Sequence, residues 1–330
     1  MDDLLDMVIC RIPGLKGEEK IALEKKFDNE DDFSVLSKND IESVIGRVLK
    51  GPSWTIAQIR SMAEKDAAAA LKLGIRRVSW REKDYPPLLR EIFDPPALLF
   101  YRGMFPNPEK PLVAVVGTRK PSSEGAARAF TLGRELGEAG IAVVSGLALG
   151  IDAMAHRGNI EGGSQTVAVL GSGLDNVYPV SNRLLARRIL ETGGAIFSEY
   201  LPGTAPLKGN FPARNRIISA LARGTVIVEA PERSGALITA RCALDQGRDL
   251  WVDRVGVSSP RGAGTARLAE DGAGVIDSAM DILAEWNLTA SIGKGSGRAK
   301  RKNAAQSAPQ NNTPGAGLAS SLAEYLDIKL

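Results

Sequence analysis

From residue 112 onward, six short apolar runs alternate with segments of helical composition, and this alternation constrains the fold more than any other feature. The apolar runs occupy residues 112–116, 141–144, 166–170, 195–198, 225–228 and 250–252. Helical segments at 123–139, 151–162, 181–192, 215–222 and 234–246 separate them. Strands that alternate with helices of this length form right-handed βαβ units. The sequence therefore predicts an α/β fold with a doubly wound, mostly parallel sheet covered by helices on both faces.

The residues before this region have a different, mostly helical pattern. We expect helices at 17–27, from about 41, and at 55–73, followed by an irregular segment with two Pro-Pro pairs that runs up to residue 103. A turn at Ile12-Pro13-Gly14-Leu15 is also typical of helix-hairpin-helix modules, which hold DNA phosphates on backbone N–H groups, but plain helical packing is the favoured explanation. We place a small helical domain at 1–84 and the α/β domain at 85–288.

A change of composition near residue 289 marks a third region. Residues 289–330 are rich in Gly, Ser and Asn and carry a basic cluster from Lys294 to Lys302. This composition is typical of a flexible linker. We expect a flexible basic tail that ends in a short helix at 320–330.

Composition excludes several classes of protein. His156 is the only histidine, and Cys10 and Cys242 are the only cysteines, so His-rich metal sites, four-cysteine zinc sites and a disulfide framework are not expected. The longest apolar stretch, at 141–155, contains Asp152 and is too short for a membrane span. The acidic start Met1-Asp2-Asp3 is unlike a signal peptide. We expect a cytoplasmic protein without a membrane segment, a metal or a cofactor.

Glycine, hydroxyl and cationic residues gather where the expected strands end. In an open parallel sheet, ligands bind beyond the carboxyl ends of the strands, where helix N-termini attract anions. The residues there that could hold phosphates are Gly117, Arg119, Lys120, Ser122, Ser145, Gly146, Lys208, Arg214 and Arg216. Several such loops side by side would hold phosphates in a row, as a nucleic-acid strand presents them. The alternative is that Gly-Ser turns simply connect strands to helices.

Arginine supplies 17 of the 20 Lys and Arg residues between 101 and 289, and its planar fork suits bidentate phosphate contact. Codon usage is an equally good explanation of that excess on composition alone. Phe211 lies in the same loop as Lys208 in a chain with only 5% aromatic residues. An aromatic ring beside a cation is the usual stacking surface for an unpaired base, although Phe211 could instead fill a gap in the core.

Motifs for nucleotide cofactors and for nucleophilic catalysis are weak. Gly171-Ser172-Gly173 lacks the third glycine of the dinucleotide fingerprint, and no P-loop motif occurs. Asp152 and His156 are one helical turn apart, so they could form a contact that is structural rather than catalytic. Glu199 and Glu229 end two strands near the cations. We expect them to orient Arg214 or Arg216, with acid–base catalysis as the alternative. We assign no catalytic residue.

A set of motifs in order and at natural spacing over residues 85–255 resembles the DNA-processing protein A (DprA/Smf) family. The motifs are Gly117-Thr118-Arg119 with Ser122, Ser145-Gly146-Leu147-Ala148 with Gly150-Ile151-Asp152, Val169-Leu170-Gly171-Ser172-Gly173-Leu174-Asp175 with Tyr178-Pro179, Ser198-Glu199, Phe211-Pro212-Ala213-Arg214-Asn215-Arg216, and Val228-Glu229-Ala230 with Ser234-Gly235-Ala236-Leu237-Ile238-Thr239-Ala240. The helical N-terminal part is similar to the family's small SAM-like domain. The resemblance implies a Rossmann-like central domain.

The resemblance also implies a function. It implies a homodimer that binds single-stranded DNA without sequence preference, protects it, and loads the RecA recombinase onto it in natural transformation or homologous recombination. It makes Arg119, Lys208 and Phe211 the DNA-contacting residues, with phosphates held by the neighbouring Gly117, Ser122, Ser145, Gly146 and Arg214. We add Lys120 and Arg216 from the strand ends, and Asp152, His156, Glu199 and Glu229 as structural support of the groove.

The sequence departs from the family in three places. Val252-Asp253-Arg254 stands where the family has Val-Pro-Gly, and Gly264-Thr265-Ala266 replaces a Gly-Thr-Asn segment. Many members end in a winged-helix domain, for which residues 290–330 are too few, so we expect that domain to be missing or vestigial.

The alternative function is that of a nucleotide-processing enzyme of the lysine-decarboxylase-like phosphoribohydrolase type. Those enzymes have a Pro-Gly-Gly-x-Gly-Thr motif before a helix that carries a catalytic Glu, and neither has a match around Pro231 to Ala236.

Overall fold

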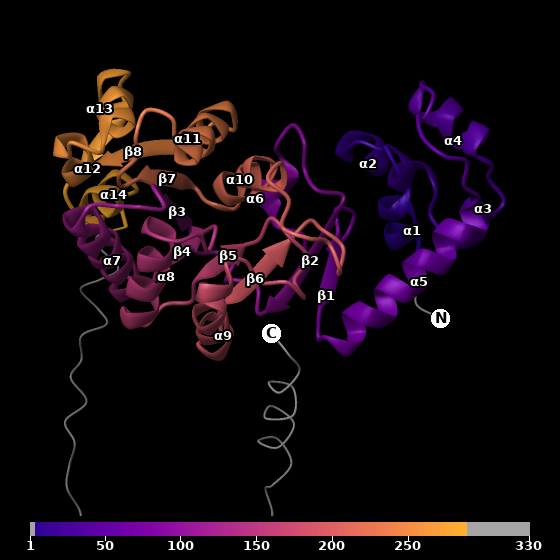
Figure 1. Cartoon of the computed structure of the whole chain (residues 1–330), viewed down its shortest axis with the longest axis horizontal. Helices are drawn as coiled ribbons and strands as arrows, with labels where there is room; N and C mark the ends of the chain where they lie inside the picture. The colour runs from indigo at the N-terminus through magenta and orange to yellow at the C-terminus, as the bar shows by residue number, and fades with distance from the viewer. Residues whose placement is uncertain (1–3, 289–330) are drawn as a thin grey trace, which may run out of the picture.

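The computed structural model describes residues 4–288, and within them one nine-stranded sheet forms the centre of the molecule (Figure 1). The strands are β1 (Arg76–Ser79), β2 (Leu98–Gly103), β3 (Leu112–Val116), β4 (Ala142–Ser145), β5 (Val167–Val169), β6 (Ala195–Ser198), β7 (Gly224–Ile227), β8 (Asp249–Asp253) and β9 (Gly274–Ile276). Their order across the sheet is β1-β2-β6-β5-β4-β3-β7-β8-β9. The seven strands from β6 to β9 pair in parallel, and only β1 and β2 are antiparallel to their neighbours. The predicted α/β, Rossmann-like fold is confirmed.

Helices cover both faces of the sheet. They are α7 (Ser123–Glu138), α8 (Ile151–Glu161), η1 (Val180–Asn182), α9 (Arg183–Glu191), α10 (Asn210–Leu221), α11 (Gly235–Asp245), α12 (Arg254–Ser258), α13 (Ala263–Glu270) and α14 (Ala279–Glu285). Val113 and Val115 of β3 pack with α7, α8 and α14, whereas Ala114 and Val116 pack with α10 and α11. Because side chains alternate along a strand, the all-apolar sequence of β3 is buried on both sides.

The N-terminal helices lie beside the antiparallel edge of the sheet, at one end of the molecule (Figure 1). They are α1 (Leu5–Arg11), α2 (Gly17–Lys26), α3 (Glu30–Ser34), α4 (Lys38–Ile45) and α5 (Ile56–Lys72), with the short α6 (Pro87–Arg90) following β1. Ser37 and Thr55 start α4 and α5 as capping boxes, because each hydroxyl accepts a hydrogen bond from the third residue of its helix. Leu98 and Phe100 of β2 share one apolar core with α1 and α5.

One sequence prediction is wrong in this region. The segment before residue 103 is not irregular throughout, because β1 and β2 pair there over four residues. The two Pro-Pro pairs lie between these strands rather than in them, so they do not interrupt the pairing. The domain boundary at residue 84 stays a prediction, although β1 already belongs to the sheet. The flexible tail, its short helix and the missing winged-helix domain fall on 289–330, outside the described residues.

The departure at Val252-Asp253-Arg254 has a structural explanation. The buried Asp253 side chain accepts a hydrogen bond from the Val255 backbone N–H (3.0 Å), which starts α12, and pairs with Arg128 of α7 (2.6 Å). Arg254 in turn pairs with Asp277 (2.6 Å). Side-chain bonds therefore fix the turn after β8.

Of the helices between residues 4 and 288, none combines the length and apolar character needed to cross a bilayer.

Candidate functional site

A groove of about 800 Å³ lies at the carboxyl ends of the central strands. We call it the strand-end groove and define it by the residues that line it. These are residues 116–120 at the end of β3, Ala148 and Asp152 after β4, Tyr178, seven residues around the start of α10 (Pro206, Lys208, Phe211, Pro212, Arg214, Asn215 and Ile218), and six around the start of α11 (Pro231, Arg233, Ser234, Gly235, Ala236 and Thr239). In the sheet, β3 lies between β4, which follows it directly in the chain, and β7, which the chain reaches only after β4, β5 and β6. Ligands of open α/β sheets bind where the strand order reverses in this way.

The strand-end groove is cationic. Arg119, Lys120, Lys208 and Arg233 are exposed along it, and Arg214 is buried within it. Among the described residues that line it, Asp152 is the only carboxylate. The Asp152 side chain accepts hydrogen bonds from the backbone N–H groups of Gly146 (3.0 Å) and Ala148 (3.4 Å), so it holds the loop after β4. The groove therefore presents an excess of positive charge to an anionic ligand.

Arg214 is the residue whose surroundings are most unusual. Its relative exposure is 4%, yet its Nε and Nη1 atoms have no hydrogen-bond partner within residues 4–288. Gly146 lies directly beside it, and a Cβ atom there would force the guanidinium group to move. Burial lowers the pKa of Arg214 to about 10, with the Asp152 charge acting in the opposite direction. The side chain is thus charged at neutral pH and offers buried donors without an acceptor.

An aromatic and a cation form one wall of the groove. The Arg119 guanidinium carbon lies 5.5 Å from the centroid of the half-buried Phe211 ring. The Tyr178 and Phe211 rings are 5.7 Å apart at an angle of 46°. A Cβ atom on Gly171 would lie 3.1 Å from Phe211, so the ring rests on that glycine. The arrangement is suited to stacking of a base, because one part of the ring is held and another is accessible.

His156 is neutral and buried. Its Nδ1 atom is 2.7 Å from the Thr166 hydroxyl, which itself donates to the Val143 carbonyl (2.8 Å), so Nδ1 donates to that hydroxyl. Burial, followed by the Arg214 charge, lowers the pKa of His156 to about 3. The possible Asp152–His156 contact does not form among the described residues, because the two side chains bind the β4 loop and Thr166 instead.

Glu229 supports the groove in a way that the sequence did not indicate. Its side chain is fully buried and accepts hydrogen bonds from the Ser122 backbone N–H (2.7 Å), the Ser122 hydroxyl (3.2 Å) and the Ser259 hydroxyl. Its backbone carbonyl accepts from Thr118 (2.7 Å). Glu229 thus fixes the loop that carries Arg119. The expectation that it orients Arg214 or Arg216 is wrong.

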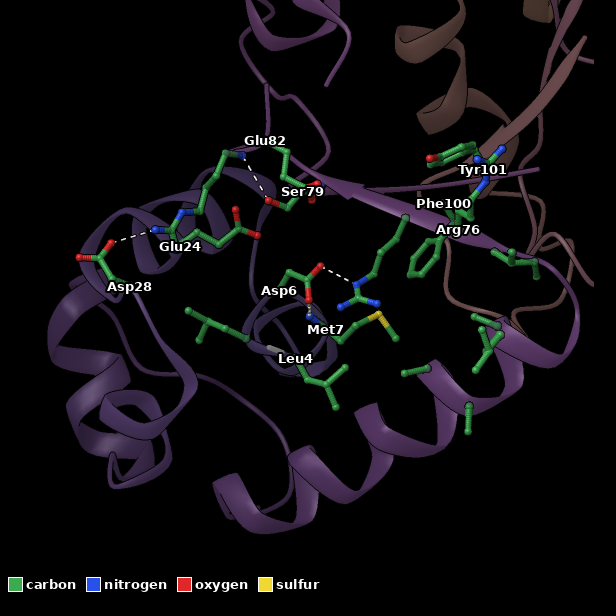
Figure 2. Close-up of a pocket in the computed structure, with 18 residues that line it drawn as sticks. Leu4, Asp6, Met7, Glu24, Asp28, Arg76, Ser79, Glu82, Phe100 and Tyr101 are labelled. Carbon is green, nitrogen blue, oxygen red and sulfur yellow. Dashed lines mark hydrogen bonds and ion pairs between the residues drawn. The ribbon is translucent and has the colours of Figure 1, made fainter. Parts of the chain in front are cut away.

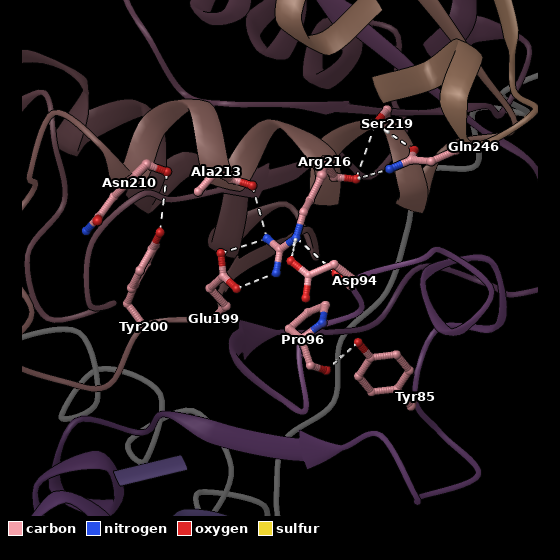
Figure 3. A network of polar contacts seen from close by, with 10 residues as sticks. All are labelled: Tyr85, Asp94, Pro96, Glu199, Tyr200, Asn210, Ala213, Arg216, Ser219 and Gln246. Atoms are coloured by element: carbon pink, nitrogen blue, oxygen red, sulfur yellow. Dashed lines mark hydrogen bonds and ion pairs between the residues drawn. The ribbon is translucent and has the colours of Figure 1, made fainter. Parts of the chain in front are cut away.

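Arg216 does not line the strand-end groove. Figure 3 shows its guanidinium group beside Glu199 and Asp94. Its Nη1 and Nη2 atoms donate to the two Glu199 carboxylate oxygens at 2.8 and 2.7 Å. Its Nε atom donates to the Asp94 carboxylate (3.1 Å) and carbonyl (2.9 Å), and Nη1 also donates to Ala213 (3.0 Å). The pairing of Glu199 with Arg216 was expected. The predicted phosphate-binding role of Arg216 does not agree with the structure, because its Nε, Nη1 and Nη2 atoms already donate to acceptors within the fold.

Two predicted serines use their hydroxyl groups within the fold. The Ser122 hydroxyl accepts from the Gly125 N–H (2.9 Å) and caps α7, and the fully buried Ser145 hydroxyl donates to the Val115 carbonyl (2.7 Å). Neither lines the groove. Gly146 lines a small cavity beside the groove. Six of the predicted DNA-binding residues line the groove itself: Gly117, Arg119, Lys120, Lys208, Phe211 and Arg214.

Arg233, Ser234 and Tyr178 also line the groove and were not among the predicted contacts. The sequence contained a signal for the first two, because Ser234-Gly235 follows β7 as a further strand end with a cation beside it. For Tyr178 the only signal was its place in the Tyr178-Pro179 motif of the family resemblance.

Comparisons with known proteins agree on one family. The model of the family described as DNA recombination-mediator protein A matches residues 76–287. The DNA processing protein DprA of Streptococcus pneumoniae is 43% identical over 204 residues, which are 62% of this chain and 72% of the relative. The X-ray structure of that organism's DNA processing protein A superposes with a TM-score of 0.70 at 34% identity, covering 86% of this chain and 97% of the other. A Helicobacter pylori DprA structure, described by its single-stranded DNA binding mode, gives 0.58 at 31% identity, covering 64% and 95%.

Proposed function

Because this chain belongs to the DNA recombination-mediator protein A family, we propose that it binds single-stranded DNA in the strand-end groove. The observation that carries the proposal is the buried Arg214, which lines the groove and whose Nε and Nη1 donors have no acceptor within residues 4–288. A DNA phosphate oxygen would supply an acceptor for one of these donors, in a charge-assisted hydrogen bond. The Helicobacter pylori relative is described by its binding of single-stranded DNA, which supports the same ligand.

The proposed binding has no sequence preference. Arg119, Lys120, Lys208 and Arg233 would contact phosphates, which are the same in every sequence. Phe211 would stack on a base, and every base has a face on which a ring can stack. Unpaired bases are needed for that contact, so we expect a preference for single strands over duplexes.

We also propose the further steps that the family resemblance implies. Bound DNA would be protected and passed to the RecA recombinase, by a homodimer in the cytoplasm, in natural transformation or in homologous recombination generally. The proposed role is binding rather than catalysis. In its support, the family is named for mediating recombination, and the one carboxylate among the described groove residues is engaged by backbone N–H groups.

The experiment is a fluorescence-anisotropy titration of labelled single-stranded and double-stranded oligonucleotides across a salt series. We expect tighter binding of the single strand and an affinity that falls steeply as salt rises, because neutralised phosphates release counterions. Equal affinity for both forms, or an affinity independent of salt, would contradict the proposal. Co-precipitation of RecA with the DNA-bound protein, but not with the free protein, tests the loading step separately.

A further inference from the structure

A second cavity of about 720 Å³ lies between the N-terminal helices and the antiparallel edge of the sheet (Figure 2) and shares no lining residue with the strand-end groove. We call it the Glu24 cavity. Helices α1, α2 and α5, strand β1 with the residues that follow it, and Phe100 and Tyr101 of β2 line it. Cavities at such junctions between structural units are frequent ligand sites.

Most charged side chains in the Glu24 cavity already have partners. Asp6 pairs with Arg77 (2.7 Å), and Asp28 pairs with Arg81 (2.8 Å). The Glu82 carboxylate accepts from the Ser79 backbone N–H (2.8 Å). Arg76 donates to the Gly103 carbonyl and lies 4.7 Å from the centroid of the Tyr101 ring. Each of the three arginines thus has an acceptor within the fold, so the cavity is poorly suited to an anion.

Glu24 is the exception. Its relative exposure is 1%, and neither of its carboxylate oxygens has a hydrogen-bond partner within residues 4–288. Figure 2 shows its carboxyl group turned toward the interior of the cavity. A charge buried without a partner is costly, so the carboxyl group must either bind a proton or meet a cation.

The electrostatic surroundings of Glu24 agree with this geometry. Burial raises the pKa of Glu24 to about 8, and the neighbouring Asp6 and Glu82 act in the same direction, while Arg81 and Lys20 oppose them. The cavity lining includes four carboxyl groups and three guanidinium groups. An added cation therefore compensates the one charge that the fold leaves without a partner.

We propose that the Glu24 cavity binds a cationic group on an apolar stem, a guanidinium or an ammonium, with the Glu24 carboxylate as its partner. The apolar part of such a ligand would contact Leu4, Ala67, Leu71 and Ile75, which line the same cavity. Two sources share this chemistry: an arginine or lysine side chain of a partner protein, and a free aliphatic amine. The proposal is independent of DNA binding, because the two cavities share no lining residue.

The experiment is an NMR titration of the full chain with two probes at pH 8.5. One probe is N-acetyl-arginine methylamide, which presents a guanidinium as a protein does, and the other is agmatine, a free guanidinium-bearing amine. We expect saturable shifts confined to residues of the Glu24 cavity. Below pH 8 the affinity should fall by up to about tenfold per pH unit, because the carboxyl group must lose its proton before it can pair. The tighter of the two probes identifies the source.

Glu24→Gln is the decisive variant, since it keeps the shape of the side chain and removes the charge. We expect at least about a tenfold loss of probe affinity, the size of effect that a charge-assisted hydrogen bond supports. Glu18→Gln is the matched control, because Glu18 is on the same helix, is more than half exposed, and reaches only Lys16 at 3.7 Å. Its probe affinity should equal that of the wild type.

Two results would overturn the proposal: no saturable binding of either probe by the wild type, or equal affinity in Glu24→Gln. At pH 8.5, where the carboxyl group has lost its proton, Glu24→Gln removes an unpaired buried charge, so we expect its thermal midpoint at that pH to be no lower than that of the wild type. Glu24→Met provides a second variant that also lacks the charge. Unchanged binding of single-stranded DNA by both variants would show that any loss of probe affinity is local.

Discussion

Arg214 and Arg216 are two residues apart on helix α10, and the fold treats them in opposite ways. Arg216 donates to Glu199, Asp94 and Ala213, whereas two nitrogens of Arg214 lack any partner within the described part of the chain. Residues two apart on an α-helix point about 200° away from each other, so the two side chains enter different surroundings. The half-buried Arg216 is satisfied by the fold and stabilises it, while the buried Arg214 is left unsatisfied and is available to a ligand.

The largest expected effect concerns Arg216. Arg216→Met should lower the free energy of unfolding by about 3 kcal/mol, because it leaves the mostly buried Glu199 without its cation. Urea unfolding measures the change, and single-stranded DNA binding by the folded fraction should stay at the wild-type level. Arg241→Met is the control, since Arg241 is 85% exposed and contacts only Asp245 at 3.9 Å. If both variants unfold like the wild type, the Arg216 pair has no structural role.

The exposed cations of the strand-end groove should have the opposite effect, which is a loss of DNA binding without a loss of stability. Arg119→Ala combined with Lys208→Ala should remove most single-stranded DNA binding and reduce the salt slope by about 1.4, or about 0.7 for each lost phosphate contact. The melting temperature should hardly change, because both side chains are exposed. Arg187→Ala with Arg188→Ala removes the same charge from exposed positions on α9 and should leave binding nearly intact. A similar loss in that control would mean that overall charge, rather than the groove, attracts DNA.

A smaller effect is expected at Phe211. Phe211→Ala should weaken binding of single-stranded DNA by about 1–3 kcal/mol through lost base stacking. Phe93→Ala provides the control, since Phe93 is 92% exposed and does not line the groove. Anisotropy titrations compare the two variants. Should Phe211→Ala instead unfold at low urea while the folded protein binds normally, the ring fills the core and does not stack on a base.

The smallest effect is a pKa change at His156, whose NMR signals are unambiguous because the chain has one histidine. We expect the ring to remain neutral down to about pH 4, because burial and Arg214 hold its pKa near 3. Arg214→Met should raise that pKa and Arg216→Met should not. The folded-state pKa is below the unfolded value of about 6.5, so this contribution to stability is present above pH 6.5 and is lost as the pH falls. An unchanged His156 pKa in Arg214→Met would contradict the placement of that charge.

Much of the fold could be predicted because continuous apolar runs with helical spacing leave few alternatives. All six expected strands occur, as β3 to β8, within one or two residues. Strands β1 and β2 were missed because the proline pairs between them obscured their pattern, and β9 because it has only three residues. The groove could be located because parallel strands end at one edge of the sheet. The direction of each side chain could not be predicted, since Arg214 and Arg216 are the same residue type on one helix and differ only in which way they point.

The most direct test compares Arg214→Met and Arg216→Met in paired measurements of DNA affinity and unfolding free energy. Arg214→Met should lose at least about tenfold in affinity for single-stranded DNA. Its free energy of unfolding should fall by less than that of Arg216→Met, because Asp152 keeps its hydrogen bonds from the Gly146 and Ala148 backbone N–H groups. Arg216→Met should lose stability and keep its affinity. If Arg214→Met binds single-stranded DNA as tightly as the wild type does, the proposal that this buried arginine binds a DNA phosphate is contradicted.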